Sequence, residues 1–166
     1  MALAGINHLA MVTNDMDKTV RFYRDVVGME VVGTISGQIE PDVTMRHYFF
    51  SLGQSNTLAF FEWQDVEMPP RKDSGIRQSN RQFDHVSFNV DSEEALLEMQ
   101  TRVRKAGVPA TDVVDHGFIH SIYFEDPHNI SLEFSYWVKD LTKNPQFLDE
   151  NPVPAMREAS EGATTR

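Results

Sequence analysis

Three side chains that lie far apart in the sequence have the chemistry of a metal centre: His8, His85 and Glu133. Two neutral imidazoles and one carboxylate supply two nitrogens and one oxygen, a donor set that suits ferrous iron, manganese, zinc or nickel. Such a set leaves coordination positions open for a substrate. Glu133 lies between Leu132 and Phe134, where an uncompensated buried carboxylate would be costly. We expect Glu133 to face a partner and the three residues to bind a metal that takes part in chemistry. The alternative is that each is an ordinary strand residue.

An internal repeat positions these residues. His8 and His85 occupy matching places in two strand-like segments, 5–12 and 83–90, each followed by a segment with helical spacing. Gly28 and Gly107 are expected to end the two helices, and Asp91 with Glu94 resembles a capping box at the start of the second. Later in each half, 58–63 aligns without gaps on 132–137. The pattern predicts an α+β fold of two βαβββ modules.

The domain organisation follows from the same repeat. We expect a single domain over 1–138, with modules at about 5–63 and 83–137 joined by a crossover loop at 64–82, and a partly disordered C-terminal extension at 139–166. The crossover loop contains Pro and Gly and the basic residues Arg71, Lys72, Arg77 and Arg81, which fits a solvated linker or an anion-binding lid.

Composition excludes several classes of protein. The chain has 166 residues and a net charge of −10, which argues against binding to nucleic acid or to an anionic membrane. It has no Cys, so any metal site must use His and carboxylate ligands. No apolar run approaches the ~20 residues of a membrane span, and the N-terminus lacks the features of a secretory signal. We therefore expect a cytoplasmic protein.

These motifs together resemble the vicinal oxygen chelate superfamily, which includes glyoxalase I, methylmalonyl-CoA epimerase, fosfomycin and bleomycin resistance proteins and extradiol dioxygenases. The resemblance implies that the paired modules form curved, partly open mixed sheets with a concave cleft that holds the metal. It also implies a homodimer. It rests on Ile6–Ala10, Arg21–Tyr23 with Gly28–Met29, Phe83–Phe88, and Ser121–Pro127 leading to Leu132–Glu133.

Within this superfamily the extradiol dioxygenases are the most similar group. They use two His and one Glu, which implies that His8, His85 and Glu133 are the ligands, with Fe(II) favoured and Mn, Zn or Ni possible. They also carry a His-Gly and then a Tyr ahead of the ligand Glu, as His116 and Tyr123 stand here. The resemblance implies that His116 assists proton transfer and oxygen activation and that Tyr123 orients the substrate. Glyoxalase I usually supplies a fourth ligand where this chain has Ala59.

The favoured function is therefore an extradiol-type dioxygenase that acts on a small aromatic or vicinally oxygenated molecule. Two alternatives remain: a metal-dependent lyase or isomerase of the glyoxalase or epimerase type, and a metal-free resistance protein that sequesters its ligand. Elemental analysis and oxygen uptake distinguish the three.

The sequence also gives expectations for several further residues. Glu62 and His47 are left open as additional site residues, whereas Phe61, Trp63 and Trp137 are expected to be core or interface aromatics. In the turn after Asp126, His128 is expected to be exposed and Asn129 to adopt a left-handed conformation.

Overall fold

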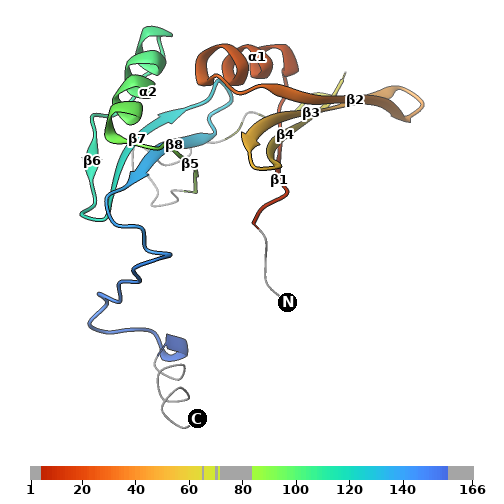
Figure 1. Ribbon diagram of the computed structural model, residues 1–166. Coiled ribbons are helices and arrows are strands. Elements are labelled where there is room, and N and C mark those ends of the chain that lie inside the picture. Colours follow the sequence, from red (N-terminus) through yellow and green to blue (C-terminus); the bar gives the residue numbers. More distant parts are fainter. Residues whose placement is uncertain (1–4, 65, 70, 72–83, 157–166) are drawn as a thin grey trace.

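The computed structural model describes residues 5–64, 66–69, 71 and 84–156. Two units with the same order of elements follow one another along the chain (Figure 1). The first contains β1 (His8–Val12), α1 (Met16–Val20) continuing into the π-helical η1 (Arg21–Val27), β2 (Val31–Glu40), β3 (Val43–Gly53) and β4 (Asn56–Trp63). The second contains β5 (Val86–Asn89), α2 (Glu93–Lys105), β6 (Val114–Asp115), β7 (Ile119–Glu125) and β8 (Ser131–Trp137).

The strands form two open four-stranded sheets with equivalent topology, in the orders β1-β4-β3-β2 and β5-β8-β7-β6. In each sheet the first strand of the module pairs in parallel with the last, and the other pairings are antiparallel. The sheets are therefore mixed, and the predicted α+β fold of two βαβββ modules is confirmed.

The helix boundaries follow from local capping. Asp15 accepts a hydrogen bond from the Lys18 backbone N–H and starts α1, and Gly28 ends η1 as predicted, in a left-handed conformation at φ +90°. The predicted capping box at Asp91 is wrong by one residue. Ser92 caps α2 instead, because its extended backbone brings the hydroxyl oxygen to 3.2 Å from the Ala95 N–H.

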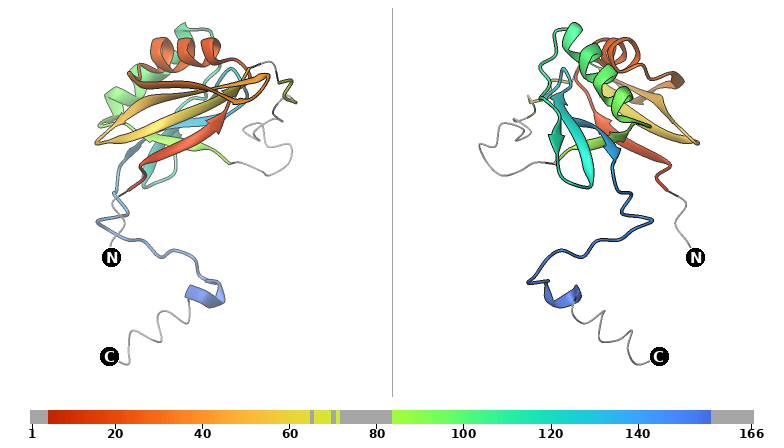
Figure 2. Two further views of the ribbon diagram at one scale, coloured as in Figure 1. Left: turned by 90° about the vertical axis from the view of Figure 1, so that its right-hand side faces the viewer. Right: turned by 60° about the vertical axis from the view of Figure 1, so that its left-hand side comes forward.

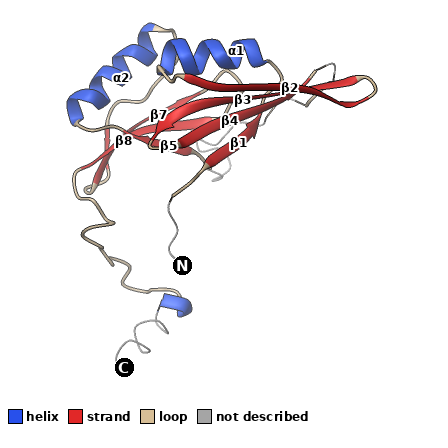
Figure 3. Ribbon diagram, turned by 45° about the vertical axis from the view of Figure 1, so that its right-hand side comes forward, coloured by secondary structure: helices blue, strands red, loops and turns tan. Residues whose placement is uncertain are grey.

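The helices cover one side of both sheets, and the core lies between the two layers (Figure 3). Tyr23, Phe50, Phe60 and Phe124 are fully buried there. Because alternate residues of a strand point to opposite sides, the residues between these core positions point to the side away from the helices. We call this side of each sheet its open face, since no described helix or strand covers it.

The turn between β7 and β8 in the second module forms hydrogen bonds with the first module. The Tyr23 hydroxyl donates to Asp126 Oδ2 at 3.2 Å, and His128 Nε2 lies 3.0 Å from Thr13 Oγ1. The expectation that His128 is exposed is wrong, because the turn packs on the start of α1 and half-buries the imidazole. The expectation for Asn129 is confirmed by its φ of 61°.

After β8 the chain leaves the sheets and extends away from them in each view (Figures 1 and 2). Phe147 and Leu148 in this segment are 80% and 76% exposed. Residues 157–166 lie outside the described residues, as do Lys72, Arg77 and Arg81 of the crossover loop, so the division into a domain and an extension stays a prediction. Over the described residues, no helix is both long enough and apolar enough to traverse a bilayer.

Candidate metal and catalytic site

His85 and Glu133 form a pair on the open face of the second sheet. In β8, Leu132 and Phe134 point into the core, which turns Glu133 toward the open face. His85 directly precedes β5, which pairs in parallel with β8. The His85 Nε2 atom lies 2.9 Å from Glu133 Oε2. Glu133 is only 5% exposed, so this contact is the compensation that a buried carboxylate requires.

A second polar pair adjoins the first. Tyr123 in β7 is directly opposite Glu133 in the strand register, and its hydroxyl lies 3.0 Å from Nε2 of His116. The Tyr123 ring also meets the His85 ring edge to face, with 5.8 Å between centroids. Burial, together with the negative charge of Glu133, raises the pKa of Tyr123. Tyr123 therefore stays protonated at neutral pH and can donate to His116.

A cavity of about 430 Å³ opens beside Glu133, Tyr123 and His116. Sequence reasoning found three of its residues, His116, Tyr123 and Glu133, and missed the hydroxyl and amide groups around them. The signal available for the missed groups was the alternation of polar residues in β5 and in β8, the strand that carries Glu133. Trp137 lines this cavity as well as packing on Phe118, so it is not a core residue. The lining residues are Ser87, Asn89, His116, Phe118, Ile119, Tyr123, Glu133, Ser135 and Trp137.

The open face of the first sheet is aromatic rather than polar. The His47 ring stacks on Phe61 with 3.6 Å between centroids, and His8 meets Phe49 edge to face at 6.3 Å. Burial, and to a smaller extent the nearby His8, lowers the pKa of His47. Phe61 in turn stacks on Trp63. This face can hold a planar ring but offers few hydrogen-bonding groups.

In its neutral form, His8 can offer Nε2 as a metal ligand. Its Nδ1 lies 2.8 Å from Asn7 Oδ1, which can only accept, so Nδ1 carries the proton and Nε2 is left with its lone pair. The side chain is exposed at the beginning of β1.

The structure brings His85 and Glu133 together but does not bring His8 to them within one chain. Over the described residues, no three His, Asp or Glu side chains are grouped closely enough to hold a metal ion. Glu62 points to the helical side of its sheet. It accepts hydrogen bonds from Arg46 Nη1 at 2.7 Å and from the Met16 N–H at 2.8 Å, which gives it a structural role.

The donors present fit a divalent metal in type. His85 and Glu133 supply one nitrogen and one oxygen that lie 2.9 Å apart, and His8 supplies an imidazole nitrogen on the equivalent strand of the other module. The hydroxyls of Ser87 and Ser135, 2.7 Å apart beside Glu133, make the surroundings polar.

Comparison with known proteins identifies the family. Residues 5–134 match the Glyoxalase/Bleomycin resistance protein/Dioxygenase superfamily, so the chain belongs to that superfamily. This result confirms the resemblance to the vicinal oxygen chelate group.

Solved structures show the same fold. A glyoxylase/bleomycin resistance protein/dioxygenase domain from Frankia sp. EAN1pec is 23% identical, with a TM-score of 0.63 over 82% of this chain and 99% of that one. Lactoylglutathione lyase from Agrobacterium tumefaciens is 23% identical, with a TM-score of 0.58 over 82% and 96%. The fosfomycin resistance protein of Listeria monocytogenes is 22% identical, with a TM-score of 0.56 over 81% and 94%.

Proposed function

We propose that this protein is a divalent-metal-dependent enzyme whose site forms between two copies of the chain. His85 and Glu133 of one copy and His8 of the partner subunit would hold the metal. The proposal accounts for three observations. His85 and Glu133 already meet, and His8 has a free Nε2. The His85–Glu133 pair and His8 each lie on an open face that no described helix or strand covers. Two-fold pairing would bring the aromatic face of each copy against the polar face of the other.

We further propose extradiol-type cleavage of a small aromatic diol. The observation that carries this step is the contact of 3.0 Å between His116 and Tyr123 beside the His85–Glu133 pair. A bound ferrous ion would supply Lewis acidity and redox chemistry that the side chains lack.

The side chains supply proton handling and orientation. His116 Nε2 can accept a proton from a substrate hydroxyl that takes the place of the Tyr123 hydroxyl, because a neutral imidazole has one ring nitrogen with a free lone pair. Tyr123, which stays protonated, donates a hydrogen bond that fixes the substrate oxygen. The partner's Phe49 and the partner's Phe61 would stack on the substrate ring.

The test is metal analysis followed by oxygen uptake. Untagged protein, purified without a chelator, is analysed for metals and loaded anaerobically with Fe(II). Oxygen consumption is then followed with catechol and with 2,3-dihydroxybiphenyl. We expect turnover that falls by about 100-fold or more in His116→Ala. Oxygen uptake by Glu133→Gln equal to that of the unaltered protein would contradict the assignment.

A lyase or isomerase is the second candidate, because the His116–Tyr123 pair can also move a proton without oxygen. Bound zinc, nickel or manganese without oxygen uptake would favour it. Protein that binds an aromatic ligand but no metal would instead favour the sequestering alternative.

A further inference from the structure

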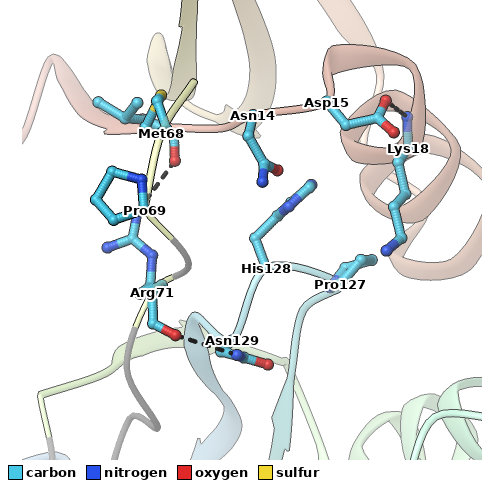
Figure 4. Close-up of a pocket in the computed structure, with 10 residues that line it drawn as sticks. Asn14, Asp15, Lys18, Met68, Pro69, Arg71, Pro127, His128 and Asn129 are labelled. Carbon is cyan, nitrogen blue, oxygen red and sulfur yellow. Dashed lines mark hydrogen bonds between the residues drawn. The ribbon is translucent and has the colours of Figure 1, made fainter. Parts of the chain in front are cut away.

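A second cavity, of about 600 Å³, lies where the two modules meet (Figure 4). It shares no lining residue with the cavity around Glu133. Its walls come from the end of β1 and the start of α1, from the turn between β7 and β8, and from the crossover loop. The lining residues are Val12, Asn14, Asp15, Lys18, Met68, Pro69, Arg71, Pro127, His128 and Asn129.

Two cationic side chains face this cavity in a protein whose net charge is −10. Arg71 donates from Nη2 to the Val12 carbonyl oxygen at 3.0 Å, which fixes one side of its guanidinium and leaves other N–H groups to donate. The Lys18 ammonium extends along the cavity toward Pro127 and forms no ion pair with any residue that the structure describes (Figure 4). The pair therefore forms a local positive region.

The one acidic member of the lining offsets this charge only in part, because Lys18 and Arg71 carry two positive charges against the single negative charge of Asp15. Asp15 turns its Oδ1 to the backbone N–H of Lys18, at 2.9 Å, and so its carboxylate is engaged in capping the helix. The Asn14 side-chain amide points into the cavity and bonds to no described residue (Figure 4). It is available to donate to a ligand.

The rest of the wall is fixed or apolar. Thr19 donates its hydroxyl proton to the Asp15 carbonyl oxygen at 2.9 Å, so its contact of 3.1 Å with His128 makes His128 Nε2 the donor. This contact holds the imidazole as a rigid wall rather than as a free ligand. Met68, Pro69 and Pro127 add carbon surface on two sides.

We propose that the junction cavity binds a small organic anion, with a carboxylate or phosphate group at Lys18 and Arg71 and an apolar body against Met68 and the prolines. Two cations with an amide donor are suited to an oxyanion, and the apolar wall is suited to the carbon part. Because both modules and the crossover loop contribute to the wall, a bound anion holds them together.

The test is titration of the full-length protein with benzoate, phenyl phosphate, inorganic phosphate and neutral benzamide. Binding is measured by calorimetry and by changes in the NMR resonances of the Asn14 side-chain amide. We expect benzoate and phenyl phosphate to bind about tenfold or more tightly than benzamide, and phenyl phosphate more tightly than inorganic phosphate. Lys18→Met and Arg71→Met should each weaken binding of both organic anions by about tenfold or more.

Matched variants keep the test specific. Lys105→Met, which removes an exposed cation on α2, should leave binding unchanged, and so should Glu133→Gln in the other cavity. Asn14→Asp, which places a carboxylate in the cavity, should weaken anion binding without removing a cation. Equal binding of benzoate and benzamide, unchanged binding in both cation variants, or loss of binding in Glu133→Gln would overturn the proposal.

Discussion

Glu133 is the residue on which the proposed metal centre most depends. It is buried on the open face of β8, where His85 Nε2 lies 2.9 Å from its carboxylate and Tyr123 lies directly opposite it in β7. Cation binding would supply the stronger compensation that a buried carboxylate favours.

Replacing this carboxylate tests that role directly. Glu133→Gln keeps the shape but removes the charge, and we expect the affinity for Fe(II) or Zn²⁺ to fall by about 100-fold or more. Competition with a chelating dye measures the affinity. Glu98→Gln removes an exposed charge from α2 and is the control. Equal metal affinity in the two variants would exclude Glu133 as a ligand.

His128 gives stability a dependence on pH. Burial lowers its pKa below the ordinary value of 6.5, against a smaller opposing effect of Asp126 and Asp15, and Lys18 lowers it further. The unfolded chain therefore takes up a proton at a higher pH than the folded one. The contribution of His128 to stability is present above pH 6.5 and is lost as the pH falls toward the lowered value.

We therefore expect the free energy of unfolding to fall more steeply between about pH 7 and about pH 5 in the unaltered protein than in His128→Gln. Burial raises the pKa of Asp126 and acts in the opposite sense, but Asp126 is present in both proteins. Urea unfolding at each pH measures the two slopes, and parallel curves would contradict the assignment to His128.

The sequence predicts which residues lie close together better than it predicts the hydrogen bonds that each residue forms. His85, Glu133, His116 and Tyr123 were all chosen as site residues, and the structure places them around one cavity or at its edge. The hydrogen bonds of His128 could not be predicted, because they depend on how a turn of one module packs on a helix of the other.

Glu62 shows how one side chain joins three elements. It lies in β4, and its two oxygens bond to Arg46 of β3 and to the first residue of α1. The alternation of β4 predicted that it points away from the Ala59 side, but nothing in the sequence identifies the Met16 N–H as its partner.

Removal of this carboxylate should therefore loosen the helix as well as the sheet. Glu62→Ala leaves the Met16 N–H and the Arg46 guanidinium without their partner, and we expect a loss of about 2 kcal/mol of unfolding free energy. Thermal or urea unfolding followed by circular dichroism measures it. Asp17→Ala, which breaks the exposed pair with Arg21, should cost much less. Similar losses in both variants would show that Glu62 acts as an ordinary surface charge.

The repeat made the elements predictable, because the period-two pattern and the glycines after each helix are local signals. The start of α2 was misplaced by one residue because Asp91 and Ser92 are both good N-caps, and only the backbone conformation distinguishes them.

Over the whole molecule, the open faces of the two modules differ in chemistry. The first is aromatic and carries His8, whereas the second is polar and carries Glu133. Sequence reasoning predicted both histidines at equivalent positions but could not predict that one chain leaves them apart, since that depends on how the modules pack.

Mixing two inactive variants distinguishes a shared site from a site within one chain. His8→Ala and Glu133→Gln should each be inactive alone. After denaturation and joint refolding, half of the dimers contain one chain of each kind, and one of the two sites in such a dimer has every ligand. We expect recovery of about one quarter of the normal activity. If dimers that contain one chain of each variant are present but no activity is recovered, the shared site is refuted.

One feature of β2 bears on how readily this protein could change its ligand. Gly37 pairs with Met45 on the open face of the first sheet, and a Cβ built there would meet no other atom within 4 Å. Alanine, serine or valine, each one nucleotide substitution from a glycine codon, would add a Cβ to this open face without displacing any neighbouring atom. In the proposed shared site, where a ligand would stack on this aromatic face, a single mutational step at Gly37 would therefore narrow the range of accepted molecules.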